Sequence, residues 1–381
     1  MKITIICDVL GEPNNGTTIA TMNLIKHLKE KGHEIRIVCN DADKKNLDGF
    51  YVVPELNLLF LNAIVHRNGV KLSRVDKKTL NEALKDSDMV HCMLPFALSH
   101  YAVRYCKKQK IPVTAGFHAQ AENVSAHFFM KNWDKANNLI YKFFYKRVYR
   151  YVDGIHYPTQ FIRDVYESVV GLTPGVVISN GVNEIYRKQP SPRPENLKNK
   201  FIILNVGRYC SEKNQDVLIK AIDLSKHKAD IHLILAGTGP DKGKLTRLVK
   251  RLNVDCEFNF YSRADLVKVI NYADLYCHPA EVEIESISCI EAISCGLVPI
   301  VADSKKCATK YFAIDEKSLF VNKNPASLAE KIDYWIEHPQ EKEAYSKKYL
   351  NTAFSFDQKL CMEKMERFLL DNYAKHRKKE K

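Results

Sequence analysis

Apolar and polar residues alternate along the chain in a pattern that predicts strands followed by amphipathic helices. Residues 2–7 form a short apolar run, and residues 17–31 then place an apolar side chain every three positions, as on one face of a helix. A second apolar run follows at residues 34–39. A strand, a helix and a strand in this order predict a parallel β-sheet.

The same alternation fills two separate stretches of the chain. The first stretch continues with expected strands at residues 89–93 and 111–116. Residues 189–200 are rich in proline and polar side chains and are the best candidate for a linker. Beyond them we expect strands at 201–206, 231–236, 256–261, 275–278 and 298–302, and helices at 215–224, 242–252, 265–273 and 286–294.

This organisation predicts an α/β protein with two Rossmann-like, doubly wound parallel-sheet domains. We expect an N-terminal domain at residues 1–180 and a C-terminal domain at residues 181–356, followed by a final helix pattern within residues 357–381. The charged end of the chain, residues 375–381, is expected to be frayed. Ligands of open parallel sheets bind at the carboxyl ends of the strands, so we expect a central cleft lined by the loops of both domains.

Composition narrows the class of protein. The chain has 381 residues, of which 45% are hydrophobic and 27% charged, as in a soluble globular protein. It shows neither an apolar signal peptide nor an apolar run of about 18 residues that could span a membrane. Its 11 cysteines form no CxxC pair, which favours free thiols in a reducing compartment over disulfides or a zinc site. We therefore expect a cytoplasmic protein.

The net charge of +13 predicts an anionic partner. Nucleic acid, a membrane surface and an anionic substrate all satisfy the charge alone. A basic surface without any such partner is the alternative interpretation.

Two loops that follow expected strands carry candidate phosphate-binding residues. Arg208 and Lys213 follow the strand at residues 201–206, where a guanidinium fork and an ammonium suit a diphosphate. Gly237 and Gly239 follow the strand at residues 231–236, where glycine lets backbone approach a ligand closely. Taken singly, each loop is also typical of ordinary surface turns.

The most specific pattern is the pair Glu283 and Glu291. Glu291 lies among isoleucines and alanine, where a carboxylate needs partners, and two ribose hydroxyls would serve. The expected helix start near Ser286 offers unpaired N–H groups and a positive dipole end to phosphates. Glu283, in the preceding loop, could reach a sugar. An exposed glutamate on a helix edge is the alternative interpretation of Glu291.

Together these motifs resemble retaining glycosyltransferases of the GT-B fold, family 4. The resemblance rests on the spacing from Glu283 to Glu291 with Gly296 and Pro299, on the Val206–Arg208 and Glu212–Lys213 elements, and on the AGTGP turn at residues 236–240. Residues 180–182 match the family's NGVD crossover, with Asn183 in place of the aspartate. Gly16 matches one glycine of the first loop, and Asn15 replaces the other.

The resemblance implies a role for each matching residue. It implies that Arg208 and Lys213 hold the donor diphosphate and stabilise the leaving nucleotide, that Glu291 binds ribose and that Glu283 contacts the donor sugar. It places Gly16 against the diphosphate and His118 beside the reacting sugar. It also implies retention of anomeric configuration, and a C-terminal helix that packs back on the N-terminal domain.

The resemblance further implies a nucleotide sugar as co-substrate and no required cofactor. UDP-glucose is the expected donor, and a GDP-sugar stays open. No DxD-type acidic pair is well placed for a metal, so we expect no metal site, with the cations stabilising the diphosphate instead.

Residues 128–151 point to the acceptor. They alternate aromatic and apolar side chains, including Phe128, Phe129, Trp133, Leu139 and Phe143, with lysines and arginines, as in helices that lie in a membrane interface. A core helix with snorkelling cations is the alternative. We expect a peripheral enzyme on the inner leaflet that glycosylates a lipid, such as the bacterial diacylglycerol glucosyltransferases, on an anionic membrane surface.

Other functions stay open at this point. The acceptor could be a polysaccharide, a polyprenyl-linked glycan or a small molecule. A nucleotide-sugar epimerase of the same fold would use the same diphosphate site without an acceptor surface. A non-enzymatic nucleic-acid or membrane-surface binding protein would explain the charge, but it lacks a nucleic-acid motif and leaves Glu283 and Glu291 unexplained.

Overall fold

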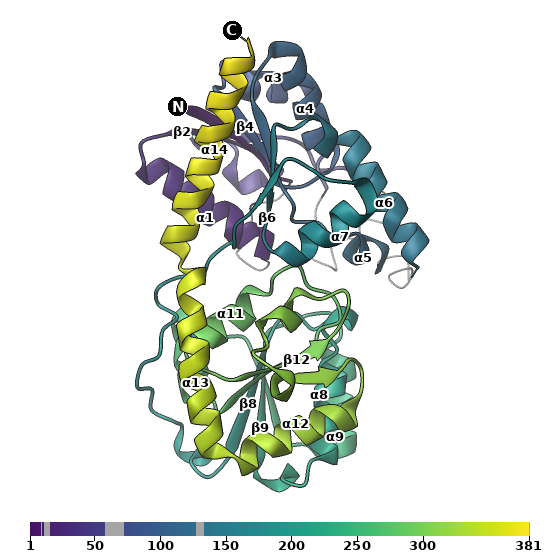
Figure 1. Cartoon of the computed structure of the whole chain (residues 1–381), viewed down its shortest axis with the longest axis vertical. Helices are drawn as coiled ribbons and strands as arrows, with labels where there is room; N and C mark the ends of the chain where they lie inside the picture. The colour runs from purple at the N-terminus through teal and green to yellow at the C-terminus, as the bar shows by residue number, and fades with distance from the viewer. Residues whose placement is uncertain (9, 11–15, 58–71, 127–132, 381) are drawn as a thin grey trace. The chain divides into compact units, whose positions relative to one another are not determined.

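The computed structural model describes residues 1–8, 10, 16–57, 72–126 and 133–380 and divides the chain into two compact units. The first unit comprises Met1–Asn180 and Lys359–Lys381, and the second comprises Gly181–Gln358. Each unit contains one parallel β-sheet covered by helices (Figure 1). The expected α/β fold class is confirmed.

The first unit is built on a seven-stranded sheet with the order β3-β2-β1-β4-β5-β6-β7, and every neighbouring pair of strands is parallel. Its strands are β1 Lys2–Ile6, β2 Glu34–Cys39, β3 Phe50–Val52, β4 Met89–Cys92, β5 Val113–Gly116, β6 Gly154–Tyr157 and β7 Gly175–Val177. Its helices are α1 Gly16–Glu30, α3 Lys77–Leu84, α4 Ala97–Gln109, α5 Ala121–Ala126, α6 Asp134–Arg147, α7 Gln160–Val170 and α14 Gln358–Glu380.

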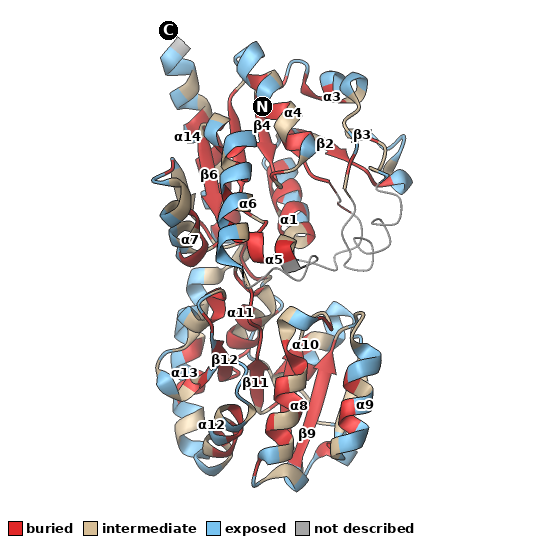
Figure 2. Cartoon of the chain, turned by 90° about the vertical axis from the view of Figure 1, so that its right-hand side faces the viewer, coloured by how far each residue is buried: buried red, intermediate tan, exposed pale blue. Residues whose placement is uncertain are grey.

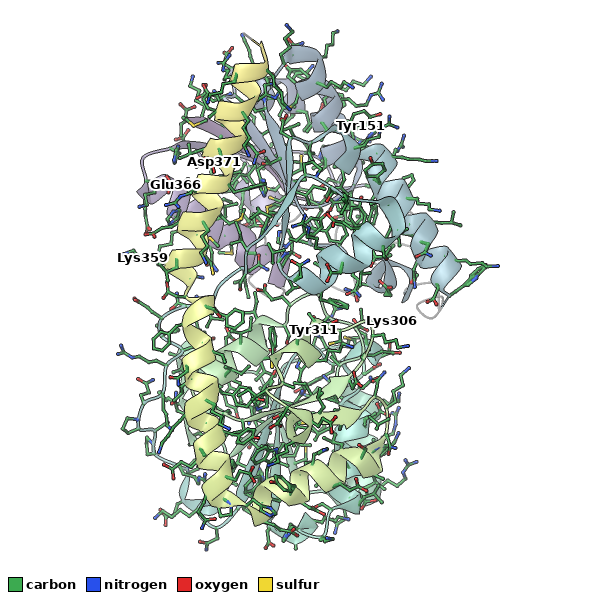
Figure 3. All side chains as sticks on the ribbon, in the orientation of Figure 1. Tyr151, Lys306, Tyr311, Lys359, Glu366 and Asp371 are labelled. Carbon is green, nitrogen blue, oxygen red and sulfur yellow. The ribbon has the colours of Figure 1, made fainter. Side chains whose placement is uncertain are left out.

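The C-terminal helix α14 packs on the first unit. Met365 and Leu369 share one buried core cluster with Ile3 and Ile5 of β1. Glu366, labelled on α14 in Figure 3, accepts one hydrogen bond from each of two histidines of this unit, His27 at 3.0 Å and His33 at 3.1 Å. The C-terminal helix is therefore part of the first unit, together with the N-terminal residues.

The second unit is built on a six-stranded parallel sheet with the order β10-β9-β8-β11-β12-β13. Its strands are β8 Phe201–Val206, β9 Ile231–Ala236, β10 Cys256–Asn259, β11 Leu275–His278, β12 Pro299–Asp303 and β13 Leu319–Val321. Its helices are α8 Gln215–Leu224, α9 Lys242–Leu252, α10 Arg263–Tyr272, α11 Ile287–Ser294, α12 Pro325–Glu337 and α13 Pro339–Ala353.

Local sequence explains where these helices begin. The Ser262 hydroxyl accepts a hydrogen bond from the Asp265 N–H at the start of α10, and the Asn324 side chain accepts one from Ser327 at the start of α12. Pro325 occupies the first turn of α12, where the missing N–H costs nothing. Buried residues, coloured red in Figure 2, make up most of the strands and one face of several helices.

Two expectations about irregular segments are wrong. Residues 189–200 lie inside the second unit, where Arg193 binds Asp274 with both oxygens at 3.0 Å and Leu197 is buried, so tertiary contacts hold this proline-rich segment. The tail expected to fray at residues 375–381 continues α14 as far as Glu380. The His376 ring, 3.0 Å from the Asp153 carboxylate, attaches this last part of the helix to the first unit.

Two structural observations relate to the expected cytoplasmic location: the state of the cysteine thiols and the character of the helices. All 11 thiols are free, and every one except the half-buried Cys256 is buried. Among the described helices, none combines the length and the apolar character needed to cross a bilayer.

Candidate functional site

The loop after β8 and the turn after β9 pack against each other at the carboxyl edge of the second sheet. The Gly207 N–H donates to Ala236 at 3.0 Å, and the Tyr209 N–H donates to Thr238 at 2.9 Å. A Cβ atom at Gly237 would lie 2.0 Å from the Gly207 carbonyl oxygen. A Cβ atom at Gly239 would lie 2.4 Å from the Tyr209 carbonyl oxygen. Both glycines are thus required by close packing of the two loops, and their contact with a ligand stays a prediction.

The loop after β8 also carries the two expected cations. Arg208 is about one-third exposed, and its guanidinium lies 3.4 Å from the Glu212 carboxylate. Lys213 ends a short 3₁₀ turn, Ser211–Lys213, and is mostly buried. Two hydrogen bonds connect this segment to the loop after β11. The Asn214 side-chain amide donates to the Pro279 carbonyl oxygen at 3.1 Å, and the Glu281 backbone N–H donates to the Glu212 carbonyl oxygen at 2.8 Å.

These ties place Lys213 against Glu283. The Lys213 ammonium donates to the Glu283 carboxylate, and both side chains are mostly buried. The Glu283 backbone N–H donates to the carbonyl oxygen of Lys306 at 3.3 Å (Lys306 is labelled in Figure 3). An ammonium has three donors, so this pair leaves Lys213 able to bind a second anion.

Burial and the ion pair act in opposite directions on both groups. Burial alone raises the pKa of the Glu283 carboxyl, but the Lys213 charge and His278 outweigh it and lower the pKa to about 2. Burial likewise acts to lower the pKa of Lys213, and Glu283 reverses this and raises it. Both groups are therefore charged at neutral pH.

His278 is a further member of this cluster, and sequence analysis missed it. Its ring is buried at the end of β11, and its Nε2 lies 3.6 Å from Glu283 and 3.3 Å from the Ser286 hydroxyl. Its Nδ1 lies 3.2 Å from the Tyr276 hydroxyl, which also donates to Ser288 at 3.1 Å. Burial lowers the pKa of His278, so the ring is neutral at physiological pH.

Ser286 precedes the first turn of α11. Its backbone adopts a left-handed conformation with φ of 62°, and its side chain does not cap the helix. The hydroxyl contacts His278 instead, so the first N–H groups of α11 receive no side-chain cap from Ser286. This geometry fits the expected anion contact at the helix N-terminus.

Glu291 lies on α11 and is half-buried. Burial raises the pKa of its carboxyl to about 7, and the Tyr186 hydroxyl and the Arg263 charge act in the opposite direction. Tyr186 is a second residue that sequence analysis missed. The carboxyl thus sits in a weakly compensated environment, where hydroxyl donors from a ligand would stabilise its charge.

His118 follows β5 in the first unit and is half-buried. The ring of the preceding Phe117 stacks on Tyr149 at a centroid distance of 5.1 Å, and Tyr149 donates to the Gly116 carbonyl at 3.1 Å. The His118 ring meets His156 edge-on at 5.5 Å. Burial lowers the pKa of His118 well below its usual value, and the neighbouring histidines add to this effect, so the ring is neutral.

The N-terminal glycine loop is described only in part. Gly16 is the exposed first residue of α1, whereas Asn15 lies outside the described residues. At the crossover, Asn183 donates to Gln358 at 3.1 Å and accepts from the Ile185 N–H at 3.1 Å. The asparagine thus makes both a donor and an acceptor contact, which an aspartate could not.

The basic and aromatic segment at residues 128–151 forms α6 and its flanks, and Phe128 and Phe129 lie outside the described residues. One face of α6 is core, with Tyr141 and Phe144 buried. The opposite face exposes Trp133 by 56%, Leu139 by 68% and Phe143 by 53%. Exposed cations lie among them: Lys135, Lys142, Lys146 and Arg147. The core-helix interpretation is met on the buried face, and the membrane-interface interpretation of the exposed face stays a prediction.

The structure brings Lys213, Glu283 and Ser286 together around His278 at the carboxyl edge of the second sheet. A cavity of about 490 Å³ lies elsewhere in the same unit, beside Asp274 and Val298, which precede β11 and β12. That cavity is therefore at the amino edge and is not the candidate site. In the described part of the chain, no three His, Cys, Asp or Glu side chains are grouped so that they could hold a metal ion.

Two protein-family models match the chain. The model for Glycosyltransferase Family 4 matches residues 14–184, and the model for Glycosyl transferases group 1 matches residues 187–351. The two matches follow one another along the chain and together span most of it.

Individual proteins are similar over parts or all of the chain. The alpha-monoglucosyldiacylglycerol synthase of Streptococcus pneumoniae is 21% identical over 322 residues, which are 79% of this chain and 71% of that protein. The catalytic domain of cholesterol-alpha-glucosyltransferase from Helicobacter pylori is 46% identical over 41% of this chain and 99% of that domain, with a TM-score of 0.39.

Among solved structures that match the whole fold, Anabaena Alr3699/HepE in complex with UDP-glucose has a TM-score of 0.77. It is 16% identical and covers 97% of this chain and 100% of its own. This likeness shows the fold. With the two family models and the two parallel-sheet units, it leads to one conclusion: the chain is a GT-B glycosyltransferase and belongs to the family-4-like transferases that these models define.

Proposed function

We propose that this transferase moves glucose from UDP-glucose to a membrane lipid of the diacylglycerol type, with retention of anomeric configuration, while bound to an anionic cytoplasmic membrane surface. The observation that carries the lipid assignment is the outer face of α6, where Leu139 and Phe143 are exposed among cations. The streptococcal relative supports it, because its name describes a synthase of alpha-monoglucosyldiacylglycerol.

The outer face of α6 has the chemistry of a membrane-interface helix. Three exposed apolar side chains, Trp133, Leu139 and Phe143, can enter the acyl boundary, where each buried CH₂ contributes about 0.8 kcal/mol. The surrounding lysines and Arg147 would meet anionic headgroups, each contributing about 1 kcal/mol near the surface. The Arg147 guanidinium already lies 5.4 Å from the Phe143 ring centroid, so the charge sits directly beside the apolar face.

The donor is assigned to the carboxyl edge of the second sheet. Glycosyltransferases take nucleotide sugars, and breaking the bond between sugar and diphosphate builds negative charge on the phosphates. We assign Arg208 and Lys213 to the diphosphate, with the α11 N-terminus at Ser286 as an additional anion contact. Glu283, held by Lys213 and His278, is assigned to the donor sugar, and Glu291 to the ribose hydroxyls.

Two residues of the first unit complete the assignment. His118 is proposed to act beside the reacting sugar, as a neutral ring that can donate or accept one hydrogen bond. Gly16 is proposed to approach the diphosphate through its backbone.

The test is product analysis with labelled nucleotide sugars. UDP-glucose, UDP-galactose and GDP-mannose are each offered with vesicles that contain diacylglycerol and either anionic or neutral phospholipid. We expect an α-linked glucolipid from UDP-glucose, formed faster on anionic vesicles. Glu283→Gln should abolish it. Nucleotide release without a lipid product on any vesicle would contradict the lipid acceptor and favour a soluble glycan.

The membrane surface has its own test. Leu139→Ser with Phe143→Ser should weaken vesicle binding by about tenfold or more, because two apolar contacts are removed. The matched control is Leu172→Ser, since Leu172 is 92% exposed in the same unit but is not part of α6. If both variants bind vesicles as the unmodified chain does, α6 is not the membrane contact.

A further inference from the structure

The carboxyl edge of the first sheet contains a buried carboxylate that is only half satisfied. Asp8 lies two residues beyond the end of β1, and its side chain is 2% exposed. One carboxylate oxygen, Oδ1, accepts a hydrogen bond from the Ser73 N–H at 3.0 Å. The other oxygen, Oδ2, is buried and has no hydrogen-bond partner among the residues that the structure describes.

A second unsatisfied side chain lies at the end of the neighbouring strand. Asn40 follows β2, and its backbone N–H donates to the Asp8 carbonyl oxygen at 3.1 Å, so the two residues are adjacent. Asn40 is 8% exposed, and its side-chain oxygen and nitrogen are both buried with no partner in the described part of the chain. Three polar atoms thus lack hydrogen bonds within one short stretch of the sheet edge.

Folded proteins rarely tolerate this arrangement. A buried polar group without a hydrogen bond loses its hydration with no compensation, and most such groups are paired. The amino edge of the same sheet obeys the rule, because Asp88 accepts a hydrogen bond from the Lys2 N–H at 2.8 Å. Asp88 is moreover only half-buried, so the fully buried oxygen without a partner that marks Asp8 does not occur there.

We propose that Asp8 and Asn40 form a hydroxyl-binding subsite for the substrate. The carboxylate oxygen accepts a hydrogen bond from one hydroxyl, and the Asn40 amide can both donate to and accept from a second. This combination matches adjacent hydroxyl groups, which occur on a sugar ring and on glycerol. The proposal rests on the proposed transfer function and names two sources of hydroxyls, the transferred sugar and the acceptor.

The ionisation behaviour of Asp8 agrees with a ligand-binding role. Burial raises the pKa of Asp8 to about 6, while the hydrogen bonds from Ser73 act in the opposite direction. At neutral pH the protein thus holds a charged oxygen in a poorly compensated place. A hydroxyl donor from the substrate would supply the missing compensation.

The test compares three variants of the full chain: Asp8→Asn, Asn40→Ala and the control Asp88→Asn. Loss of a hydrogen bond to a charged group should lower kcat/KM by roughly 10- to 100-fold in Asp8→Asn. Asn40→Ala should fall in the same direction, and Asp88→Asn should keep the unmodified kinetics. Asp8→Asn can retain the bond from Ser73, so its thermal unfolding midpoint should not drop.

Two reaction readouts distinguish the source of the hydroxyls. If the acceptor supplies them, Asp8→Asn slows transfer but leaves hydrolysis of UDP-glucose to water unchanged. If the transferred sugar supplies them, hydrolysis and transfer fall together while UDP still binds.

A third readout needs no turnover and separates this proposal from the lipid assignment. Methyl α-glucoside and a short-chain diacylglycerol are each added to the unmodified chain, and the shift of the thermal unfolding midpoint is measured. We expect one of them to raise the midpoint, and Asp8→Asn to lose that shift. The subsite does not exist if neither probe shifts the unfolding midpoint of the unmodified chain. It does not exist either if kcat/KM is unchanged in both Asp8→Asn and Asn40→Ala.

Discussion

The carboxyl edges of the two sheets each contain a buried carboxylate, and the two carboxylates differ in the partners that compensate their charge. In the second unit, Glu283 is compensated within the protein by Lys213 and His278, and its pKa falls to about 2. In the first unit, one oxygen of Asp8 has no partner among the described residues, and burial raises the pKa of this carboxyl to about 6. Two sheets of the same architecture thus differ, because the buried carboxylate has partners at one carboxyl edge and, within the described residues, lacks one at the other.

This difference indicates a division of labour. An edge that already balances its charges can hold a rigid ammonium ready for a diphosphate, because preorganised charge costs no rearrangement during the reaction. An edge with unpaired oxygens and an unpaired amide offers hydrogen bonds that only a ligand can complete. We therefore assign the phosphates to the edge with Lys213 and hydroxyls to the edge with Asp8.

The largest effect is expected for Lys213→Ala. Removing the charge that we assign to the leaving diphosphate should lower kcat by about 10²- to 10³-fold. The matched control is Lys220→Ala, which breaks the 2.7 Å pair with Asp216 on a partly exposed helix surface of the same unit. Steady-state UDP release should hardly change in that control, since exposed pairs contribute below about 1 kcal/mol.

The comparison predicts stability changes of opposite sign for the two carboxylates. A carboxyl with a lowered pKa stabilises the fold at neutral pH and loses that contribution as pH falls toward about 2. A carboxyl with a raised pKa costs the fold stability progressively as pH rises from its ordinary pKa of 3.8, and in full above about 6. At pH 7, Glu283→Gln should therefore cost about 3 kcal/mol, and Asp8→Asn should add roughly 1 to 2 kcal/mol.

Urea denaturation at pH 7 measures both variants. If the two substitutions shift the unfolding midpoint in the same direction, the contrast between the edges is wrong. Repeating the measurement near pH 4, where Asp8 is protonated, should remove the gain from Asp8→Asn and leave most of the loss from Glu283→Gln.

His278 is expected to act by positioning Glu283 rather than by touching the substrate. His278→Gln should lower kcat by up to about tenfold, because Glu283 loses the polar ring that lies 3.6 Å from its carboxylate, and should leave KM for the nucleotide sugar unchanged. His278→Asn, whose shorter side chain cannot reach as far, should lose more. A parallel rise in KM would instead indicate direct contact with the donor.

The smallest effect concerns pH and Glu291. Burial raises the pKa of its carboxyl to about 7, and ribose hydroxyls bind best to the ionised form. The affinity for UDP should therefore fall about fivefold as pH drops from 7 to 6, because the carboxyl must lose a proton on binding. Calorimetric titration at several pH values measures this, and Glu291→Gln should bind more weakly with no such dependence.

Strong periodicity made much of the fold predictable from the sequence. The boundaries of β8, β9, β11, α8 and α9 agree with expectation to the residue, because each is a clear apolar run or a clear amphipathic helix. Four of the short strands, β3, β6, β7 and β13, were not foreseen, because a run of three or four residues often shows no period. The proline-rich segment was misassigned because Arg193 finds Asp274 only in three dimensions, 81 residues away.

The candidate site divides in the same way. Arg208, Lys213, Glu283 and Glu291 carry a spacing that sequence reveals. His278 is a single histidine before a proline, and nothing in the pattern distinguishes it. Asp8, Asn40 and Ser73 come from three distant segments that only the sheet brings together. Contacts across the sheet, and the absence of contacts, cannot be inferred from local pattern.

Binding of UDP to the full chain, measured by calorimetry at pH 7.5, tests the assignment of the two edges most directly. We expect Arg208→Ala and Lys213→Ala each to weaken binding by at least about tenfold, since each removes a charge-assisted contact to phosphate. Asp8→Asn should bind UDP as the unmodified chain does. If Lys213→Ala keeps full affinity, or if Asp8→Asn loses it, the diphosphate is not held at the edge of the second sheet.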